Sequence, residues 1–199
     1  AQFKITSVVE GPAGTIWCST PSNGIVVFNP DGTSRKDMVD QLAQQNKGMN
    51  PNRVDHLYRD RTGYIWALAE DKIFRYRLAD RRWETVIPSS RSFFLSILQV
   101  SGDRWLVGTL RGFQMLAYEA GAWEARKVAI AGQSPSDSVM VDKLFADRSG
   151  NIYASHNNQG LVTYALEEDR LIGKRALEIG GSVNAFYEHP EQAHIWVGT

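Results

Sequence analysis

Hydrophobic and polar residues alternate with a period of two in short runs along this chain. Clear examples lie at residues 54–59, 141–146 and 183–187. Successive side chains of an extended strand point to opposite faces, so the alternation predicts strands with one face more buried than the other. The stretch 37–45 departs from this pattern. Its apolar spacing and residue propensities favour a short helix.

The runs at 54–59 and 141–146 lead into a turn that contains glycine and then into a second apolar strand, whereas the turn after 183–187 has no glycine. The turns at 60–63 and 147–150 read Asp-Arg-x-Gly. An Asp carboxylate at the first position accepts backbone N–H groups of the turn, and Gly at the fourth takes a positive φ. A third strand begins at Gly24, Gly112 and Gly160, and a fourth strand is expected at 83–86 and 123–127.

An aromatic residue three positions after the glycine marks the first four repeats, and the fifth keeps the aromatic but has Ala193 in place of the glycine. The five anchors are Trp17, Trp66, Trp105, Tyr153 and Trp196, and they are 49, 39, 48 and 43 residues apart. Repeats of 40–50 residues built from four short strands are typical of β-propeller blades. We therefore predict an all-β fold of four-stranded antiparallel blades, with about four and a half repeats. The chain is expected to be one propeller segment over 1–199. Its blades are expected at 5–50, 51–91, 92–137 and 138–180, with a partial blade at 181–199.

These repeats predict an incomplete arc of a larger propeller, since the first unit holds its own opening strand and the fifth has two strands. The strict position of the anchor aromatics predicts packing between blades. Phe93 and Phe94 open a strand and are expected in the core. Trp83 and Trp123 lie on outer strands, where partial exposure is expected.

The charge, the cysteine content and the hydrophobicity of the chain exclude several classes of function. Lys plus Arg and Asp plus Glu both total 22, so no basic surface is available for nucleic acid. The single Cys18 excludes an internal disulfide and is expected to be buried within a strand. No run approaches the roughly 18 apolar residues that span a bilayer, so no membrane segment is expected in 1–199.

The loops between second and third strands are the first candidates for a ligand site, because they meet on one face of a propeller. They lie at 21–23, 70–72, 110–111 and 156–159, and the last is a dense polar His-Asn-Asn-Gln sequence suited to hydroxyl-rich ligands. An ordinary exposed loop remains the alternative. The candidate ligand-binding residues are Asn23, Arg111, His156, Asn157 and Asn158.

Catalytic and metal chemistry are not indicated. His189, Glu191 and His194 lie within six residues, but no fourth ligand is placed beside them. Asp60 and Asp147 are explained by turn geometry, and no phosphate-binding or nucleophile motif is present. We therefore expect no catalytic residue, metal or cofactor.

The motif Asp-Arg-x-Gly-x-Ile-Trp at 60–66, the strand Trp-Leu-Val-Gly-Thr at 105–109 and Gly-Leu-x-x-Tyr at 160–164 resemble the two-component-regulator propeller repeat. The resemblance covers essentially the whole chain. Three blades depart from it: 10–14 lacks the Asp, 100–102 shortens the turn, and Tyr153 replaces Trp.

This resemblance implies the periplasmic sensor region of a hybrid histidine kinase, anchored by a membrane helix outside this piece. Such sensors commonly respond to oligosaccharides and work as homodimers. A glycoside hydrolase or lyase, or a protein-docking scaffold, are the alternatives for a propeller of this kind.

Overall fold

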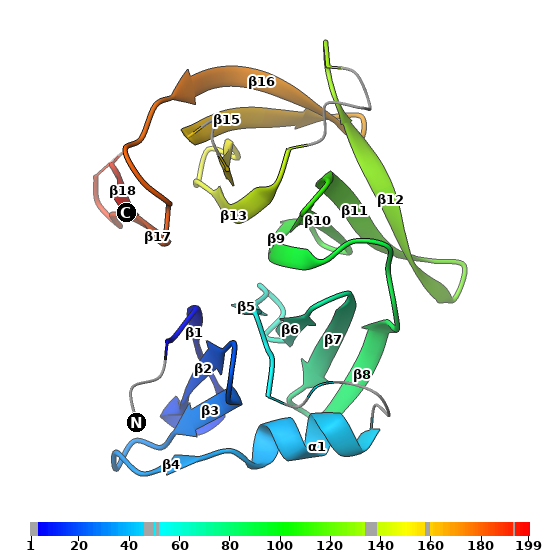
Figure 1. Cartoon of the computed structure of the whole chain (residues 1–199), viewed down its shortest axis with the longest axis vertical. Helices are drawn as coiled ribbons and strands as arrows, with labels where there is room; N and C mark the ends of the chain where they lie inside the picture. The colour runs from blue at the N-terminus through cyan, green and yellow to red at the C-terminus, as the bar shows by residue number, and fades with distance from the viewer. Residues whose placement is uncertain (1–3, 46–49, 51, 134–138, 158–159, 193) are drawn as a thin grey trace. The chain divides into compact units, whose positions relative to one another are not determined.

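The computed structural model describes residues 4–45, 50, 52–133, 139–157, 160–192 and 194–199. The chain forms two compact units, Ala1–Phe94 and Leu95–Thr199. In both, the predicted strands form antiparallel sheets of the β-propeller type (Figure 1).

Unit 1 contains two four-stranded sheets, in the order β1-β2-β3-β4 and β5-β6-β7-β8. The strands are β1 (Ser7–Glu10), β2 (Ile16–Thr20), β3 (Gly24–Phe28), β4 (Ser34–Arg35), β5 (His56–Arg59), β6 (Ile65–Ala69), β7 (Lys72–Arg77) and β8 (Arg82–Ile87). A 3₁₀ turn, η1 (Pro12–Gly14), joins β1 to β2. These sheets are the first two predicted blades.

The core of unit 1 lies between its two blades and under a helix. Trp17 of β2 is 1% exposed, and its ring lies 5.1 Å from Tyr76 and 6.3 Å from Trp83 of the next blade. The predicted helix is present as α1 (Asp37–Gln45), which contacts β3 and β8 (Figure 1). Its buried Met38 and Leu42 join the same apolar cluster. The helix is therefore part of the packing that joins the two blades.

Unit 2 contains one eight-stranded sheet and one hairpin. The strands of the sheet are β9 (Phe94–Ser101), β10 (Arg104–Thr109), β11 (Gly112–Glu119), β12 (Ala122–Ile130), β13 (Val141–Ala146), β14 (Ile152–His156), β15 (Gly160–Glu167) and β16 (Arg170–Leu177). They form two four-stranded blades, joined because the outer strands β12 and β16 pair in parallel through Ala129–Ile130 and Arg170–Leu171. The hairpin is β17 (Ala185–Glu188) and β18 (Ile195–Gly198).

The core of unit 2 lies between the blades β9–β12 and β13–β16. Phe113 is 1% exposed, and its ring meets Tyr164 edge-on at 5.5 Å. On the opposite side, Phe145 of β13 stacks on Phe186 of β17 at 5.4 Å. Each blade of this unit is thus covered by its neighbour, as repeats too thin to bury their own faces require.

The aspartate turns adopt the predicted geometry. The Asp60 carboxylate accepts the amides of Thr62 and Tyr64, and Gly63 has φ +93°. The second Asp60 oxygen also accepts the indole N–H of Trp66 at 2.8 Å. One carboxylate therefore closes the turn and fixes the aromatic anchor of the same blade.

The equivalent turn of unit 2 uses the same arrangement with different partners. Asp147 accepts hydrogen bonds from the Asn151 amide, the Asn151 side chain and the Tyr153 hydroxyl. Burial alone would raise the pKa of this carboxyl, but these hydrogen bonds outweigh it and the pKa is lowered. The carboxylate form is thus the form that the turn stabilises.

Three expectations about aromatic residues were wrong. Trp83 is buried, at 7% exposure, because it packs against Trp17 and Tyr76. Phe93 precedes β9 and is 39% exposed, whereas Phe94 is buried as predicted. Trp196 holds an anchor position but is 64% exposed.

Other expectations about burial and hydropathy have clear outcomes. Cys18 is a buried free thiol within β2, as predicted, and burial raises its pKa. Trp123 is half-buried against Trp105. Within the described residues, no helix is long and apolar enough to cross a membrane.

Candidate ligand site

The predicted ligand-binding residues are divided between the two units. His156 and Asn157 line the same cavity in unit 2, and Arg111 of that unit is not part of its wall. Asn23 belongs to unit 1. Its side-chain oxygen accepts a hydrogen bond from Lys36 at 3.0 Å, and its amide donates to the Thr20 hydroxyl. Asn158 lies outside the described residues.

A cavity of about 490 Å³ is the candidate site. This volume is within the range of ligand pockets, roughly 300–1,000 Å³. Its wall consists of Met140, Asp142, Ser155, His156, Asn157, Gly160, Glu178, Ile179, Gly181 and Ser182. The wall thus comes from the start of β13, the loop end of β14 and β15, and the segment that follows β16.

Close backbone packing shapes one side of this cavity. Gly160 opens β15 with φ +73°, and a Cβ atom there would lie 2.4 Å from the Leu177 carbonyl oxygen. Only glycine fits without moving the backbone. The glycine that the sequence places at the start of the third strand therefore lets the end of β16 lie against the cavity.

His156 is a buried part of the wall. We expected it in an exposed loop, but it is the last residue of β14 and only 3% exposed. Its Nε2 lies 2.9 Å from the Tyr164 hydroxyl, and its ring meets Phe113 edge-on. Nδ1 has no hydrogen-bond partner among the described residues.

Burial governs the protonation of this histidine. It lowers the pKa of His156 from 6.5 to about 4, against a smaller opposing effect of the Met140 carbonyl group. Burial likewise raises the pKa of Tyr164 to about 12. Both side chains are therefore neutral at pH 7, so this part of the wall offers hydrogen bonding without charge.

The charge of the cavity comes from two carboxylates. Asp142 and Glu178 are in the wall, and no Lys or Arg is among the residues that line it. Throughout the described chain, no basic side chain lies within salt-bridge distance of either carboxylate. Ser155, Ser182 and Asn157 add hydroxyl and amide groups. The cavity is therefore polar and acidic, with hydrogen-bonding groups of the kind that recognise hydroxyls.

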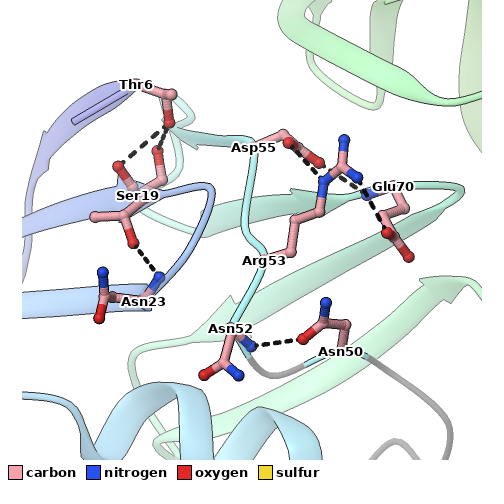
Figure 2. A network of polar contacts seen from close by, with 9 residues as sticks. Thr6, Ser19, Asn23, Asn50, Asn52, Arg53, Asp55 and Glu70 are labelled. Atoms are coloured by element: carbon pink, nitrogen blue, oxygen red, sulfur yellow. Dashed lines mark hydrogen bonds and ion pairs between the residues drawn. The ribbon is translucent and has the colours of Figure 1, made fainter. Parts of the chain in front are cut away.

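The equivalent place in unit 1 is arranged differently. Arg53 donates from Nε to Asp55 at 3.1 Å and from Nη1 to Glu70 at 3.3 Å. The Glu70 amide donates to the other Asp55 oxygen at 3.1 Å. Figure 2 shows the guanidinium between the two carboxylates. Phe93 lies against the guanidinium, 5.6 Å from it.

A hydroxyl network continues this arrangement toward the first blade. The Thr6 and Ser19 hydroxyls are 2.9 Å apart (Figure 2), and Ser7 lies 2.6 Å from Ser19. The Ser7 hydroxyl then accepts the backbone amide of Leu57 in the next blade. These hydroxyls connect the opening strands of both blades of unit 1.

The two places correspond by an offset of 87 residues, which separates the turn aspartates Asp60 and Asp147. The register agrees, since β5 pairs His56 with Leu68 and β13 pairs Lys143 with Ser155. Arg53, Asp55 and Glu70 therefore correspond to Met140, Asp142 and Asn157. Where unit 1 has an arginine between two acids, unit 2 has a methionine, one acid and an amide.

Two residues of the cavity lining, Asp142 and Glu178, were not among the predicted site residues. Asp142 could have been found, because Val-Asp-x-Leu occurs at both 54–57 and 141–144 while the arginine before it occurs only in the first copy. Glu178 lies beyond the last strand of its blade, and no local pattern places it beside β13.

Metal ligands do not gather in the described part of the chain, where no group of three or more His, Cys, Asp or Glu side chains is placed to hold an ion. The His189 Nδ1 accepts the Glu191 amide, and the His194 Nδ1 lies 3.2 Å from Gln192. These residues take part in the β17–β18 turn.

Comparisons with known proteins extend the description of the fold. No family model matches the chain, and no curated protein matches it. Solved structures do match. They include extracellular domains of the hybrid two-component systems BT4673 and BT3049 of B. thetaiotaomicron, with 17% and 12% identity and TM-scores of 0.64 and 0.69. A gluconolactonase of Xanthomonas campestris, XC5397, matches with 13% identity and a TM-score of 0.70.

Coverage differs among these structures. The matches cover 96% and 100% of this chain but only 25% and 26% of the BT4673 and BT3049 domains. For the gluconolactonase the shares are 96% of this chain and 68% of that enzyme. The chain thus spans about a quarter of the length of these two extracellular domains. At these identities the likeness shows the fold, which is of the β-propeller class.

Proposed function

We propose that this chain is part of the extracytoplasmic sensor propeller of a two-component signalling protein, and that the cavity of unit 2 binds an oligosaccharide. The observation that carries the proposal is the cavity itself. It is of ligand size, and side chains with hydroxyl, amide, imidazole and carboxylate groups outnumber the apolar Met140 and Ile179 in its lining. The fold likeness to extracellular domains of hybrid two-component systems supports the sensor role.

Two different segments of the chain contribute to the cavity wall, and this suggests how ligand binding could be signalled. Glu178, Ile179, Gly181 and Ser182 belong to the segment between β16 and β17, whereas Asp142 and Asn157 belong to the blade before it. A ligand that touches both groups would favour one arrangement of this connection over others. A ligand shifts a conformational equilibrium by its difference in affinity for the two states. The full-length protein would relay that shift as a homodimer.

Calorimetric titration of the full-length protein with a panel of oligosaccharides tests this proposal. We expect at least one member to bind, and Ser182→Phe, which fills the cavity with an aromatic ring, to weaken that binding at least tenfold. Ser149→Phe is the matched control, because Ser149 is an exposed serine in the turn at the other end of the blade. Binding that survives Ser182→Phe would place the site elsewhere, and a panel without any binder would refute the sugar-sensor role.

An enzyme is the second candidate, because two carboxylates line the cavity and the gluconolactonase shares the fold. Paired carboxylates are the usual groups of glycoside hydrolysis. Mass spectrometry of the same oligosaccharides after long incubation separates the two functions. A sensor leaves the ligand intact, whereas a hydrolase or lyase releases shorter products that disappear in Asp142→Asn.

A further inference from the structure

The charge of the cavity in unit 2 carries a more specific inference, which rests on the proposed function. Asp142 and Glu178 carry negative charge at neutral pH, and the other polar residues of the wall are uncharged. Serine hydroxyls and the asparagine amide recognise hydroxyl groups equally well on neutral and charged sugars. The two carboxylates do not, because they repel a ligand anion that lies within a few ångströms of them.

The comparison with unit 1 shows that this charge is specific to the cavity. In unit 1 the aspartate at the same strand position is neutralised by Arg53, at 3.1 Å. Unit 2 replaces that arginine with Met140, which leaves Asp142 without a cation in the described part of its surroundings. The glutamate of the unit 1 group is Asn157 in unit 2. The scaffold is thus the same, but the one positive charge that would offset the acids is missing.

The wall behind the carboxylates does not supply a positive charge either. His156 is 3% exposed, is hydrogen-bonded to the Tyr164 hydroxyl and has no partner at Nδ1 among the described residues. A buried imidazole in this setting remains neutral because desolvation disfavours its cation. Lys143, the nearest basic residue in sequence, is not part of the lining. The cavity therefore has no group that would pair with an acidic sugar.

We infer that the cavity of unit 2 discriminates by ligand charge: it accepts neutral or amino-bearing oligosaccharides and rejects those that carry carboxylate or sulfate groups, with Asp142 and Glu178 as the residues that determine this specificity. An amino sugar gains an ion pair with either carboxylate, and a neutral sugar gains hydrogen bonds to carboxylate oxygens. A uronic acid or sulfated sugar meets uncompensated like charge instead.

Calorimetric titration of the full-length protein with three oligosaccharide sets of equal length and linkage tests the inference: neutral hexose, amino-sugar and uronic-acid oligomers. We expect the uronic-acid oligomer to bind at least tenfold more weakly than its neutral counterpart. Asp142→Asn combined with Glu178→Gln keeps the shape of both side chains and should reduce this ratio to less than threefold. Glu167→Gln is the matched control, since it removes an exposed carboxylate at the far end of β15 and should leave the ratio unchanged.

Salt provides a second measurement on the unaltered protein, so the test does not depend on the folding of a variant. Added salt screens charge repulsion, so raising the ionic strength from about 0.05 M to about 0.5 M should narrow the gap between neutral and uronic-acid oligomers. Equal affinity for both oligomers, or a ratio that the double variant does not change, would overturn the charge selection while leaving the sensor role intact. Failure of all three sets to bind would refute the proposed function, and the inference with it.

Discussion

The blades β5–β8 and β13–β16 are alike in their strands and in the aspartate turn, but they differ at the end that carries the loop between the second and third strands. Both begin with a Val-Asp strand and both use an aspartate turn to hold an aromatic anchor. At the loop end, however, Arg53 joins Asp55 to Glu70 in one blade. In the other blade, Met140, Asp142 and Asn157 line an open cavity. The same frame thus carries different side chains at its loop end, with Met140 and Asn157 in place of Arg53 and Glu70.

The same difference extends to the residue at the end of the second strand. We call β5–β8 the closed blade, because Arg53 joins its two acids, and β13–β16 the open blade, because its residues line the cavity. Position 156 of the open blade holds a buried histidine, whereas the corresponding residue of the closed blade is the buried Ala69. The closed blade gains stability from ion pairs, while the open blade contains a titratable ring that burial keeps neutral. We therefore expect the two blades to respond differently to pH and to substitution.

The largest expected effect is acid destabilisation of the open blade. The pKa of His156 is lowered to about 4 in the fold, below its usual 6.5, so the unfolded chain binds a proton more readily between these values. Stability is then complete above pH 6.5 and falls as the pH drops toward 4, by about 3 kcal/mol. Urea unfolding between pH 7.5 and 4 measures the loss.

His156→Gln is the control for this measurement. It keeps a polar partner for the Tyr164 hydroxyl but removes the titrating ring, so the slope of stability against pH should become flat in this range. The closed blade differs, because Asp71 has its pKa lowered to about 2. Although burial opposes this shift, hydrogen bonds from Lys72 and Ser89 outweigh it. The stability that Asp71 contributes is lost only below about pH 4. If His156→Gln has the same slope of stability against pH as the parent protein, a group other than His156 titrates in this range.

The turn aspartates provide the second test, because the aspartate turn is alike in the two blades. Asp60→Ala should cost about 2–3 kcal/mol of unfolding free energy, since it leaves the Trp66 indole N–H and two turn amides without their acceptor. Asp147→Ala should cost about 1–2 kcal/mol, because its site is less buried and its partners reach water. Thermal and urea unfolding measure both. If Asp147→Ala lost more unfolding free energy than Asp60→Ala, the two aspartate turns would not be equivalent.

Met140→Arg converts the open blade toward the closed one. The new guanidinium is expected to pair with Asp142 and occupy the cavity, because Arg53 pairs with Asp55 in this way. Binding of an oligosaccharide identified by titration should weaken about tenfold, or ~1.4 kcal/mol, while the unfolding free energy changes little. Met140→Leu is the control, as it conserves volume and adds no charge. Unchanged affinity in Met140→Arg would contradict the role assigned to this position.

The smallest effect is expected for the reverse substitution, Arg53→Met. It leaves Asp55 and Glu70 facing each other without a cation. All three side chains are partly exposed, so the loss should be about 1 kcal/mol, and it should diminish in high salt. Arg53→Lys should recover part of it. A salt-independent loss would indicate that the packing of Arg53 on Phe93 matters more than its charge.

The repeat made most of the fold predictable from sequence. The strands, the helix at 37–45 and the aspartate turns follow from local patterns, because alternation and turn chemistry act over a few residues. Burial was harder to predict. Trp83 lies on an outer strand, yet Trp17 and Tyr76 of neighbouring strands cover it. Trp196 has the anchor position of the repeat and remains exposed.

The candidate site was predictable only in part. The sequence indicated the polar stretch at 156–159 as a candidate, and His156 and Asn157 of that stretch line the cavity. The sequence could not show that His156 turns inward, since this depends on Phe113 and Tyr164 from other strands. Nor could it place Glu178 in the same cavity as Asp142, because the path of the chain after β16 determines the position of Glu178. Site geometry depends on distant segments, whereas local patterns determine single strands.

The parallel pairing of β12 with β16 has a consequence for solubility. An outermost strand with free N–H and C=O groups is a template on which a second molecule can assemble, the route by which many β proteins form fibrils. Ala129–Ile130 and Arg170–Leu171 pair these groups within the same molecule, and the Ala131 amide extends the pairing to the Leu171 carbonyl. Ala131→Pro would remove the N–H that donates to the Leu171 carbonyl and loosen the pairing of the two outer strands, so the variant should form thioflavin-positive aggregates sooner than the parent protein.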